Sequence, residues 1–211
     1  YEYHFWKHQY SDPSGLYLAK RVFEDVRSLK YIGIDGYVED GSQRSGWPNA
    51  FPVYIYAETL MNRDCDFEAV KADYMAHIYG EDWQEAVQLL QNISDAFDFA
   101  YMEGEKSVNE QISLYYDPER VKRLSAIFDL AAQEDALVSK HMTMPYRPQT
   151  VSWRLLMRRA IYIRKWAEIL IAKAEGSNYK AIELRDAFYS DFGKYEIEME
   201  RYYDHSLACR I

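Results

Sequence analysis

The sequence has only two cysteines, Cys65 and Cys209, among its 211 residues. A chain of this length buries a sizeable core without covalent staples, so two reduced thiols are favoured over a disulfide, and the cytoplasm is favoured over an oxidising compartment. The sequence also lacks long apolar runs and a secretory signal pattern, so no membrane partner is expected. Lys and Arg total 25 against 34 Asp and Glu, a formal net charge of −9. This deficit of positive charge argues against a nucleic-acid partner.

Several motifs for cofactors and metals are absent as well. The chain contains no Gly-rich phosphate loop, no Cys-x-x-Cys pair and no Gly-x-Ser-x-Gly elbow, so no cofactor is predicted. Asp73 and His77 lie four residues apart on one face of a predicted helix. A metal site in a helical bundle needs a second motif of this kind, and none occurs, so no metal site is predicted.

What the sequence does contain changes in character near residue 65. Residues 1–6 alternate aromatic and polar side chains, which predicts a short strand. Helical spacing of apolar residues follows from Leu16 to Leu29, then a second short strand over Ile34–Val38, then a helix over about residues 50–61. Alternation of this kind is typical of βα units with parallel strands. Such a strand-like start predicts that the chain is the C-terminal part of a longer protein.

Helical patterns dominate after residue 65. Asp66, Asp82 and Asp117 each precede an apolar stripe at helical spacing, and Pro118 stands at a first helical position. A long helix is predicted from Thr150 to Gly176, followed by a last helix of about 25 residues that includes Gly193. The sequence therefore predicts a mainly α protein, with two βα units in residues 1–65 and a helical domain in residues 66–211.

Candidate site residues follow the two predicted strands. In parallel α/β folds, ligands bind beyond the carboxyl ends of the strands. Glu39 and Asp40 stand at such a place, and paired carboxylates suit acid/base work on a glycosidic oxygen, so they are the candidate catalytic residues. The candidate substrate-binding residues lie around the same strand ends: His4, Trp6, Gln43, Arg44 and Trp47.

Each candidate also has a structural interpretation. Glu39 and Asp40 could be solvated loop acids or helix caps, and His4 could be a core histidine. Gln43 and Arg44 could simply fasten the loop by hydrogen bonds. The basic run from Arg154 to Lys165 is interpreted as the solvated face of a helix.

The stretch "YEYHFWKHQYSDPSGLYLAKRVFEDVRSLKYIGIDGYVEDGSQRS", followed by "FPVYIYAETLMNRDCDFEAVKADYMAHIYGEDW", carries a family resemblance over about residues 1–85. It resembles the C-terminal part of a bacterial family of unknown function, whose members are similar to glycoside hydrolases with a (β/α)8 barrel, such as α-glucuronidases and hexosaminidases. The resemblance implies that the two βα units are the end of such a barrel, with Glu39, Asp40 and Arg44 at its mouth. It also implies that the missing strands lie upstream and that this chain alone is inactive.

Two functions from different classes remain open. The first is the C-terminal fragment of a carbohydrate-active, glycoside-hydrolase-like protein. The second is a non-catalytic helical interaction or scaffold domain, which self-associates through exposed strand edges.

Overall fold

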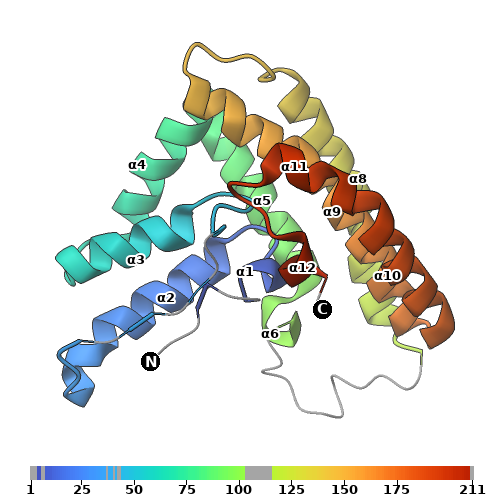
Figure 1. Cartoon of the computed structure of the whole chain (residues 1–211), viewed down its shortest axis with the longest axis horizontal. Coiled ribbons are helices and arrows are strands. Elements are labelled where there is room, and N and C mark those ends of the chain that lie inside the picture. The colour runs from blue at the N-terminus through green and yellow to red at the C-terminus, as the bar shows by residue number, and fades with distance from the viewer. Residues whose placement is uncertain are drawn as a thin grey trace.

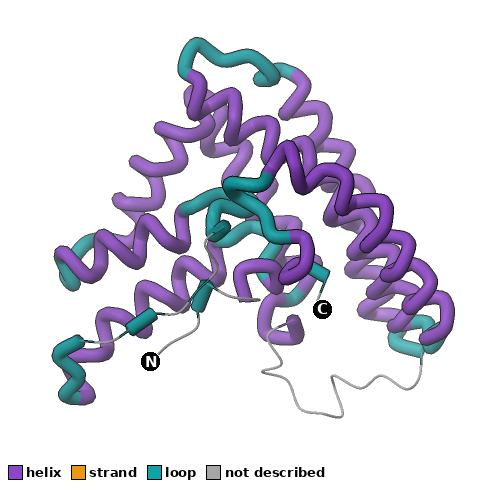
Figure 2. Tube along the Cα trace, in the orientation of Figure 1, coloured by secondary structure: helices purple, strands orange, loops and turns teal. Residues whose placement is uncertain are grey.

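The computed structural model describes residues 4–5, 8–36, 38–39, 41, 44–102 and 116–209, and within them every regular element is a helix (Figures 1 and 2). In chain order these helices are α1 (His8–Ser11), α2 (Leu16–Ser28), η1 (Leu29–Ile32), α3 (Phe51–Met61), α4 (Phe67–Tyr79), η2 (Gly80–Asp82), α5 (Trp83–Phe97), α6 (Phe99–Met102), α8 (Pro118–Ser139), α9 (Arg147–Ala174), α10 (Asn178–Phe192), η3 (Gly193–Tyr195), α11 (Glu196–Met199) and α12 (His205–Ala208). The prediction of a mainly α protein with a helical bundle is confirmed.

The helices form two arms that meet at the top of Figure 1. In one arm the long helix α9 packs between α8 and α10. In the other, α2 lies along α3, and α4 connects this pair to α5 and α9. The loop segments 44–50 and 200–204 lie side by side near the centre of the view (Figure 2), where Arg44 reaches the backbone oxygen of Tyr203.

The two predicted βα units are not found among the described residues, and this part of the fold prediction is corrected. The strand expected over Ile34–Val38 is loop at residues 34–36 and 38, and Glu39 forms only an isolated bridge. Ile34 and Val38 are 39% and 59% exposed, so the short apolar run does not pack as a core strand. Of the strand expected over residues 1–6, the structure describes only His4 and Phe5, which lie in a turn. A sheet needs a neighbouring strand to complete its hydrogen-bonded ladder, and the described residues of these two segments have none, so they give no support for a barrel end.

Helix starts predicted from capping residues are largely confirmed. The Asp66 carboxylate accepts a hydrogen bond from the backbone N–H of Ala69 at 2.8 Å, and the Asp117 carboxylate accepts one from Arg120 at 3.0 Å. These bonds satisfy N–H groups that have no partner within their own helices.

Two helix boundaries differ from the prediction. Helix α9 begins at Arg147, three residues before Thr150, whose hydroxyl instead accepts a hydrogen bond from the backbone N–H of Met144. The last helix was expected to run for about 25 residues and to include Gly193, but α10 ends at Phe192. At Gly193 a short η3 turn begins, and an added Cβ there would lie 3.1 Å from the His205 ring. The close approach of this ring explains why a glycine stands at the break.

Most buried apolar side chains belong to one large cluster, which includes Tyr10 and Phe51 as well as Trp153, Tyr162 and Leu207. A smaller cluster of Phe5, Leu18, Val22 and Val26 lies on the other face of α2. The larger core therefore contains residues from both sides of residue 65, and the domain boundary proposed there stays a prediction.

A buried acid fastens the N-terminal segment to this core. The Asp12 carboxylate, which is fully buried, accepts hydrogen bonds from the backbone N–H groups of Tyr17 and Leu18 and from the hydroxyl of Ser94. The bonds to Tyr17 and Leu18 satisfy the first turn of α2, and the bond to Ser94 connects that turn to α5.

Candidate functional site

Two of the candidates, His4 and Glu39, come together, and Asp25 joins them at the imidazole of His4. The Glu39 carboxylate accepts a hydrogen bond from the backbone N–H of His4 at 2.7 Å, and its second oxygen lies 2.9 Å from Nδ1 of the ring. On the other edge of the ring, Nε2 lies 3.2 Å from a carboxylate oxygen of Asp25 in α2. The His4 and Glu39 side chains are only 12% and 11% exposed, whereas Asp25 is 50% exposed. We call these three residues the histidine–carboxylate site.

The two carboxylates determine the protonation of His4. Burial alone would lower the pKa of His4, but hydrogen bonds to Glu39 and Asp25 and the negative charges of both outweigh it and raise the pKa above the usual 6.5. Each ring nitrogen has a carboxylate acceptor, and the raised pKa means that the doubly protonated ring persists to higher pH than in a free histidine. The neutral ring between two carboxylates can take up a proton at Nε2, beside the half-exposed Asp25, and the resulting imidazolium can release it there.

Arg44 is already engaged within the chain. Its guanidinium lies 2.7 Å from a carboxylate oxygen of Glu196 and donates to the backbone oxygen of Tyr203 at 3.3 Å. Its own backbone oxygen accepts a hydrogen bond from the side chain of Gln9. These contacts fasten the loop after Glu39 to the C-terminal segment, as the structural interpretation of Arg44 requires. A role for Arg44 in binding substrate stays a prediction.

Trp47 lies in the core and apart from His4. It is 2% exposed, and its ring packs against Tyr203, Tyr162 and Phe192 at centroid distances of 5.0, 5.7 and 6.5 Å. The remaining candidates, Trp6, Asp40 and Gln43, lie outside the described residues.

Sequence reasoning missed Asp25 and a group of arginines. Asp25 falls on the polar face of α2, and only the long-range contact with His4 distinguishes it from its neighbours. Arg147, Arg154 and Arg158 all line hollows beside α9. Their spacing of seven and four residues places them on one helix face, which was the available signal.

Metal binding finds no support in the described ranges, where no group of three or more His, Cys, Asp or Glu side chains could hold an ion. Asp73 and His77 are both exposed on α4, and Nδ1 of His77 bonds to the backbone oxygen of Asp73 instead. Both cysteines are free thiols. Among the helices that the structure describes, none combines the length and apolar character that a membrane crossing requires.

Comparisons with known proteins do not place the chain in a family. No protein-family description, no curated protein and no solved structure matches this chain. The class that the fold defines is thus a mainly helical domain, and the function must be argued from the side chains alone.

Proposed function

We propose that the chain is part of a carbohydrate-active, glycoside-hydrolase-like protein, to which it contributes the histidine–carboxylate site. The observation that carries this proposal is the position of the His4 imidazole between the carboxylates of Glu39 and Asp25. Hydrolysis of a glycoside needs one group that donates a proton to the leaving oxygen and another that accepts a proton from water. The site places an imidazole, whose pKa is raised, within hydrogen-bond distance of two carboxylates.

Within this site the residues have different roles. His4 and Asp25 share the more exposed edge, so they are the groups that contact a glycosidic oxygen or an attacking water. Glu39 uses both of its oxygens on His4, so it is a positioning residue that orients the ring and keeps it protonated. This assignment revises the catalytic role expected for Glu39. It does not require a barrel mouth.

Replacing Glu39 with glutamine in the complete natural protein is expected to reduce activity on a panel of aryl glycosides at least about tenfold, because the ring loses its charged acceptor. The pH–rate profile should also shift to lower pH, since the pKa of His4 falls. Glu24→Gln is the matched control, because Glu24 lies on the same helix as Asp25 and pairs with Lys20 at the surface. Unchanged kinetics and an unchanged pH profile in Glu39→Gln would remove the role assigned to the site.

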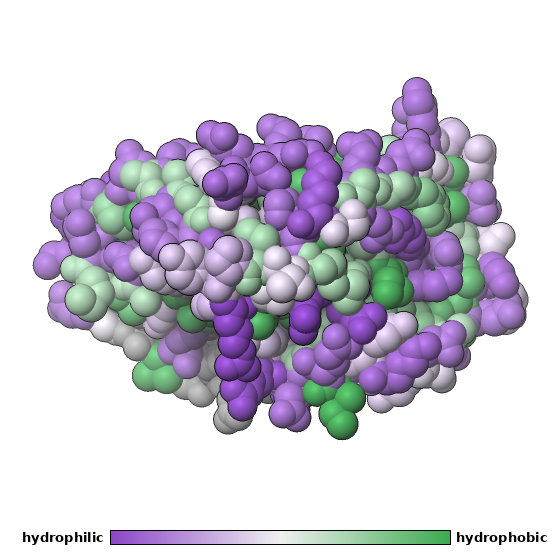
Figure 3. All heavy atoms as spheres, turned by 90° about the horizontal axis from the view of Figure 1, so that it is seen from above, coloured by the Kyte–Doolittle hydropathy of each residue, from purple (hydrophilic) through white to green (hydrophobic). Residues whose placement is uncertain are grey.

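A second candidate function, a self-associating interaction domain, is favoured by exposed apolar side chains at one end of the molecule. At this end the C-terminal ends of η1 and α3 meet, and the Arg63 guanidinium lies 5.4 Å from the centre of the Tyr31 ring. We define the apolar tip as the exposed residues Tyr31 (77%), Ile32 (66%), Leu60 (52%) and Met61 (89%). Seen from above, by contrast, the surface is mainly hydrophilic with only small apolar groups (Figure 3). Clustered exposed apolar side chains mark interaction surfaces.

If the tip mediates self-association, the chain is a dimer at micromolar concentration by sedimentation. Ile32→Asp should then give a monomer, because the substitution places a charge in the buried contact. Ile182→Asp on α10, also at an exposed isoleucine, is the matched control and should leave the dimer intact. A wild-type monomer at all accessible concentrations argues against this second function and leaves the first untouched.

A further inference from the structure

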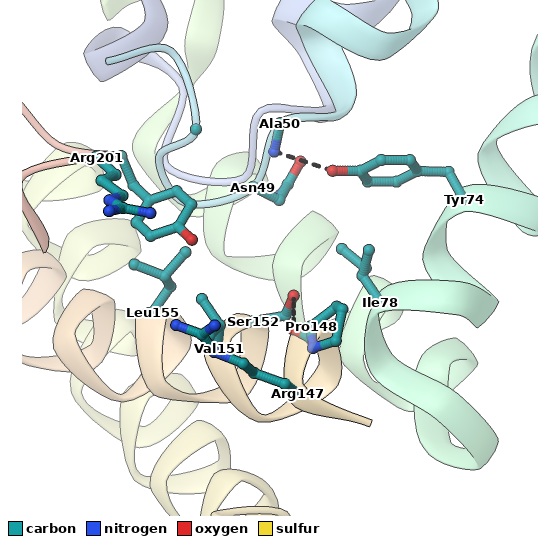
Figure 4. Close-up of a pocket in the computed structure, with 12 residues that line it drawn as sticks. Asn49, Ala50, Tyr74, Ile78, Arg147, Pro148, Val151, Ser152, Leu155 and Arg201 are labelled. Atoms are coloured by element: carbon teal, nitrogen blue, oxygen red, sulfur yellow. Dashed lines mark hydrogen bonds between the residues drawn. The ribbon is translucent and has the colours of Figure 1, made fainter. Parts of the chain in front are cut away.

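Two adjoining hollows run along α9 and share part of their lining. One, of about 330 Å³, lies between α9, α4 and the loop before α3 (Figure 4). The other, of about 250 Å³, lies between α9 on one side and α11 with the segment after it on the other. The residues common to both are Arg147, Val151, Leu155, Arg201 and Tyr202. Because they share these walls, the two hollows form one elongated depression, which we call the arginine groove.

The charge of the groove is opposite to that of the chain. Four arginines line it (Arg147, Arg154, Arg158, Arg201) against two acids, Glu198 and Glu200, so its formal charge is 4 − 2 = +2, whereas the whole chain carries −9. Within the described ranges, one of these arginines is paired with an acid. Arg158 donates two hydrogen bonds to Glu198, at 2.6 and 3.0 Å. No acid among the described residues forms an ion pair with Arg147, Arg154 or Arg201. Three guanidinium groups are therefore available to a ligand.

The walls of the groove are fixed by contacts within the fold. Tyr202 packs so closely on Gly46 that an added Cβ there would lie 2.8 Å from its ring. Asn49 is buried and bonded to the backbone of Ser14 and Phe51, and the hydroxyl of Tyr74 accepts a hydrogen bond from the backbone N–H of Ala50. Since these groups are held in place, a ligand meets a preformed surface and pays little to order it.

Figure 4 shows how the charged and apolar groups are arranged. Arg147 and Arg201 extend from different segments toward the same side of the cavity, where Leu155 lies between them, and Ile78 and Tyr74 form the opposite wall. Guanidinium groups beside flat and apolar side chains suit a ligand that has both oxyanion groups and a non-polar framework.

We propose that the arginine groove binds a small oligoanion that carries at least two carboxylate or phosphate groups. Arg147 and Arg154 are seven residues apart on one helix, so their backbones are separated by about 10 Å along its axis. One oxyanion cannot reach both ends of such a groove, whereas a chain of two or three charged units can. The inference holds whether or not the chain acts on glycosides, because it uses no residue of the histidine–carboxylate site.

The start of α9 supports an anion at this end. The helix begins at Arg147, its first turn contains Pro148, and its N-cap residue Tyr146 makes no side-chain cap. The positive end of a 28-residue helix dipole therefore meets the groove beside Arg147.

The test is isothermal titration of the whole chain in about 50 mM salt with three probes: trigalacturonate, tripolyphosphate and the neutral maltotriose. We expect at least one of the two anions to bind and maltotriose not to bind. Comparison of the two anions identifies carboxylate or phosphate as the preferred group. Arg201→Ala and Arg147→Ala should each weaken binding about tenfold or more, because each removes a charge-assisted contact. Arg185→Ala, which removes an equal charge on α10, should change it less than about twofold.

Three outcomes overturn the proposal. The first is that neither anion binds at millimolar concentration. The second is that Arg185→Ala weakens binding as much as Arg201→Ala, which indicates general attraction to positive charge. The third is that a hexaglutamate peptide binds more tightly than both probes with the same dependence on Arg201, which assigns the groove to an acidic protein segment.

Discussion

Replacing Arg159 with methionine is expected to reduce the free energy of unfolding by about 3–5 kcal/mol. The Arg159 side chain and its partner Glu134 are each only 1% exposed, and their nearest N–O distance is 2.7 Å. A second guanidinium nitrogen of Arg159 donates to the backbone oxygen of Pro13 at 2.9 Å. The substitution therefore leaves a buried carboxylate without its counter-charge and a backbone oxygen of the N-terminal segment without its donor. Urea denaturation followed by circular dichroism measures the loss.

Two further variants test whether burial of the ion pair is the cause of this loss. Arg164→Met removes a pair of similar distance with Asp135, but these side chains are 27% and 49% exposed, so the loss should be below about 1 kcal/mol. Burial raises the pKa of Glu134 despite the opposing charge of Arg159, and one oxygen of Glu134 has no hydrogen-bond partner among the described residues. The pair is thus not fully compensated, and Glu134→Leu combined with Arg159→Met should recover most of the stability. Equal losses for Arg159→Met and Arg164→Met would contradict this account of the core.

Trp47→Ala is expected to destabilise the chain by about 3–5 kcal/mol, since it empties a large volume at the centre of an aromatic cluster. The ring of Trp47 contacts side chains of α9, α10 and the C-terminal segment, so its loss affects all three. Differential scanning calorimetry should show a clearly lowered melting temperature. Trp83→Ala, at a partly buried tryptophan that packs on the edge of the same core, is the control and should cost less.

The same variant separates packing from ligand binding. If Trp47 mainly contacts a ligand, Trp47→Ala would keep the melting temperature of the free chain and lose binding. Because Trp47 is buried, we expect Trp47→Ala to lower the melting temperature of the free chain.

Local signals in the sequence predicted many of the helices, and long-range contacts explain what was missed. Asp66 and Asp117 mark helix starts because a cap depends on residues three positions away. A short apolar run such as Ile34–Val38 carries no such local signal, since whether it becomes a strand depends on a neighbour elsewhere in the chain. The end of α10 at Gly193 depends likewise on the His205 ring, twelve residues further on.

The candidate sites likewise depend on long-range contacts that local sequence signals do not reveal. His4 and Glu39 were each predicted from their places in the sequence, but their contact joins residues 35 positions apart, and Asp25 was not predicted at all. Arg154 and Arg158 were interpreted as a solvated face. Only the packing of the segment after α11 beside α9 places them in a groove with Arg201.

Two carboxylates raise the pKa of His4, and an NMR titration of its ring protons tests this most directly. Because the pKa of His4 is raised in the folded chain, its interaction with the two carboxylates stabilises the fold fully below the pKa of the unfolded state, about 6.5. This stabilisation is lost as the pH rises through the pKa of His4 in the folded state. We predict an apparent pKa above 6.5 in the wild-type chain and a lower value in Glu39→Gln. A wild-type pKa at or below 6.5 that Glu39→Gln leaves unchanged would contradict the account.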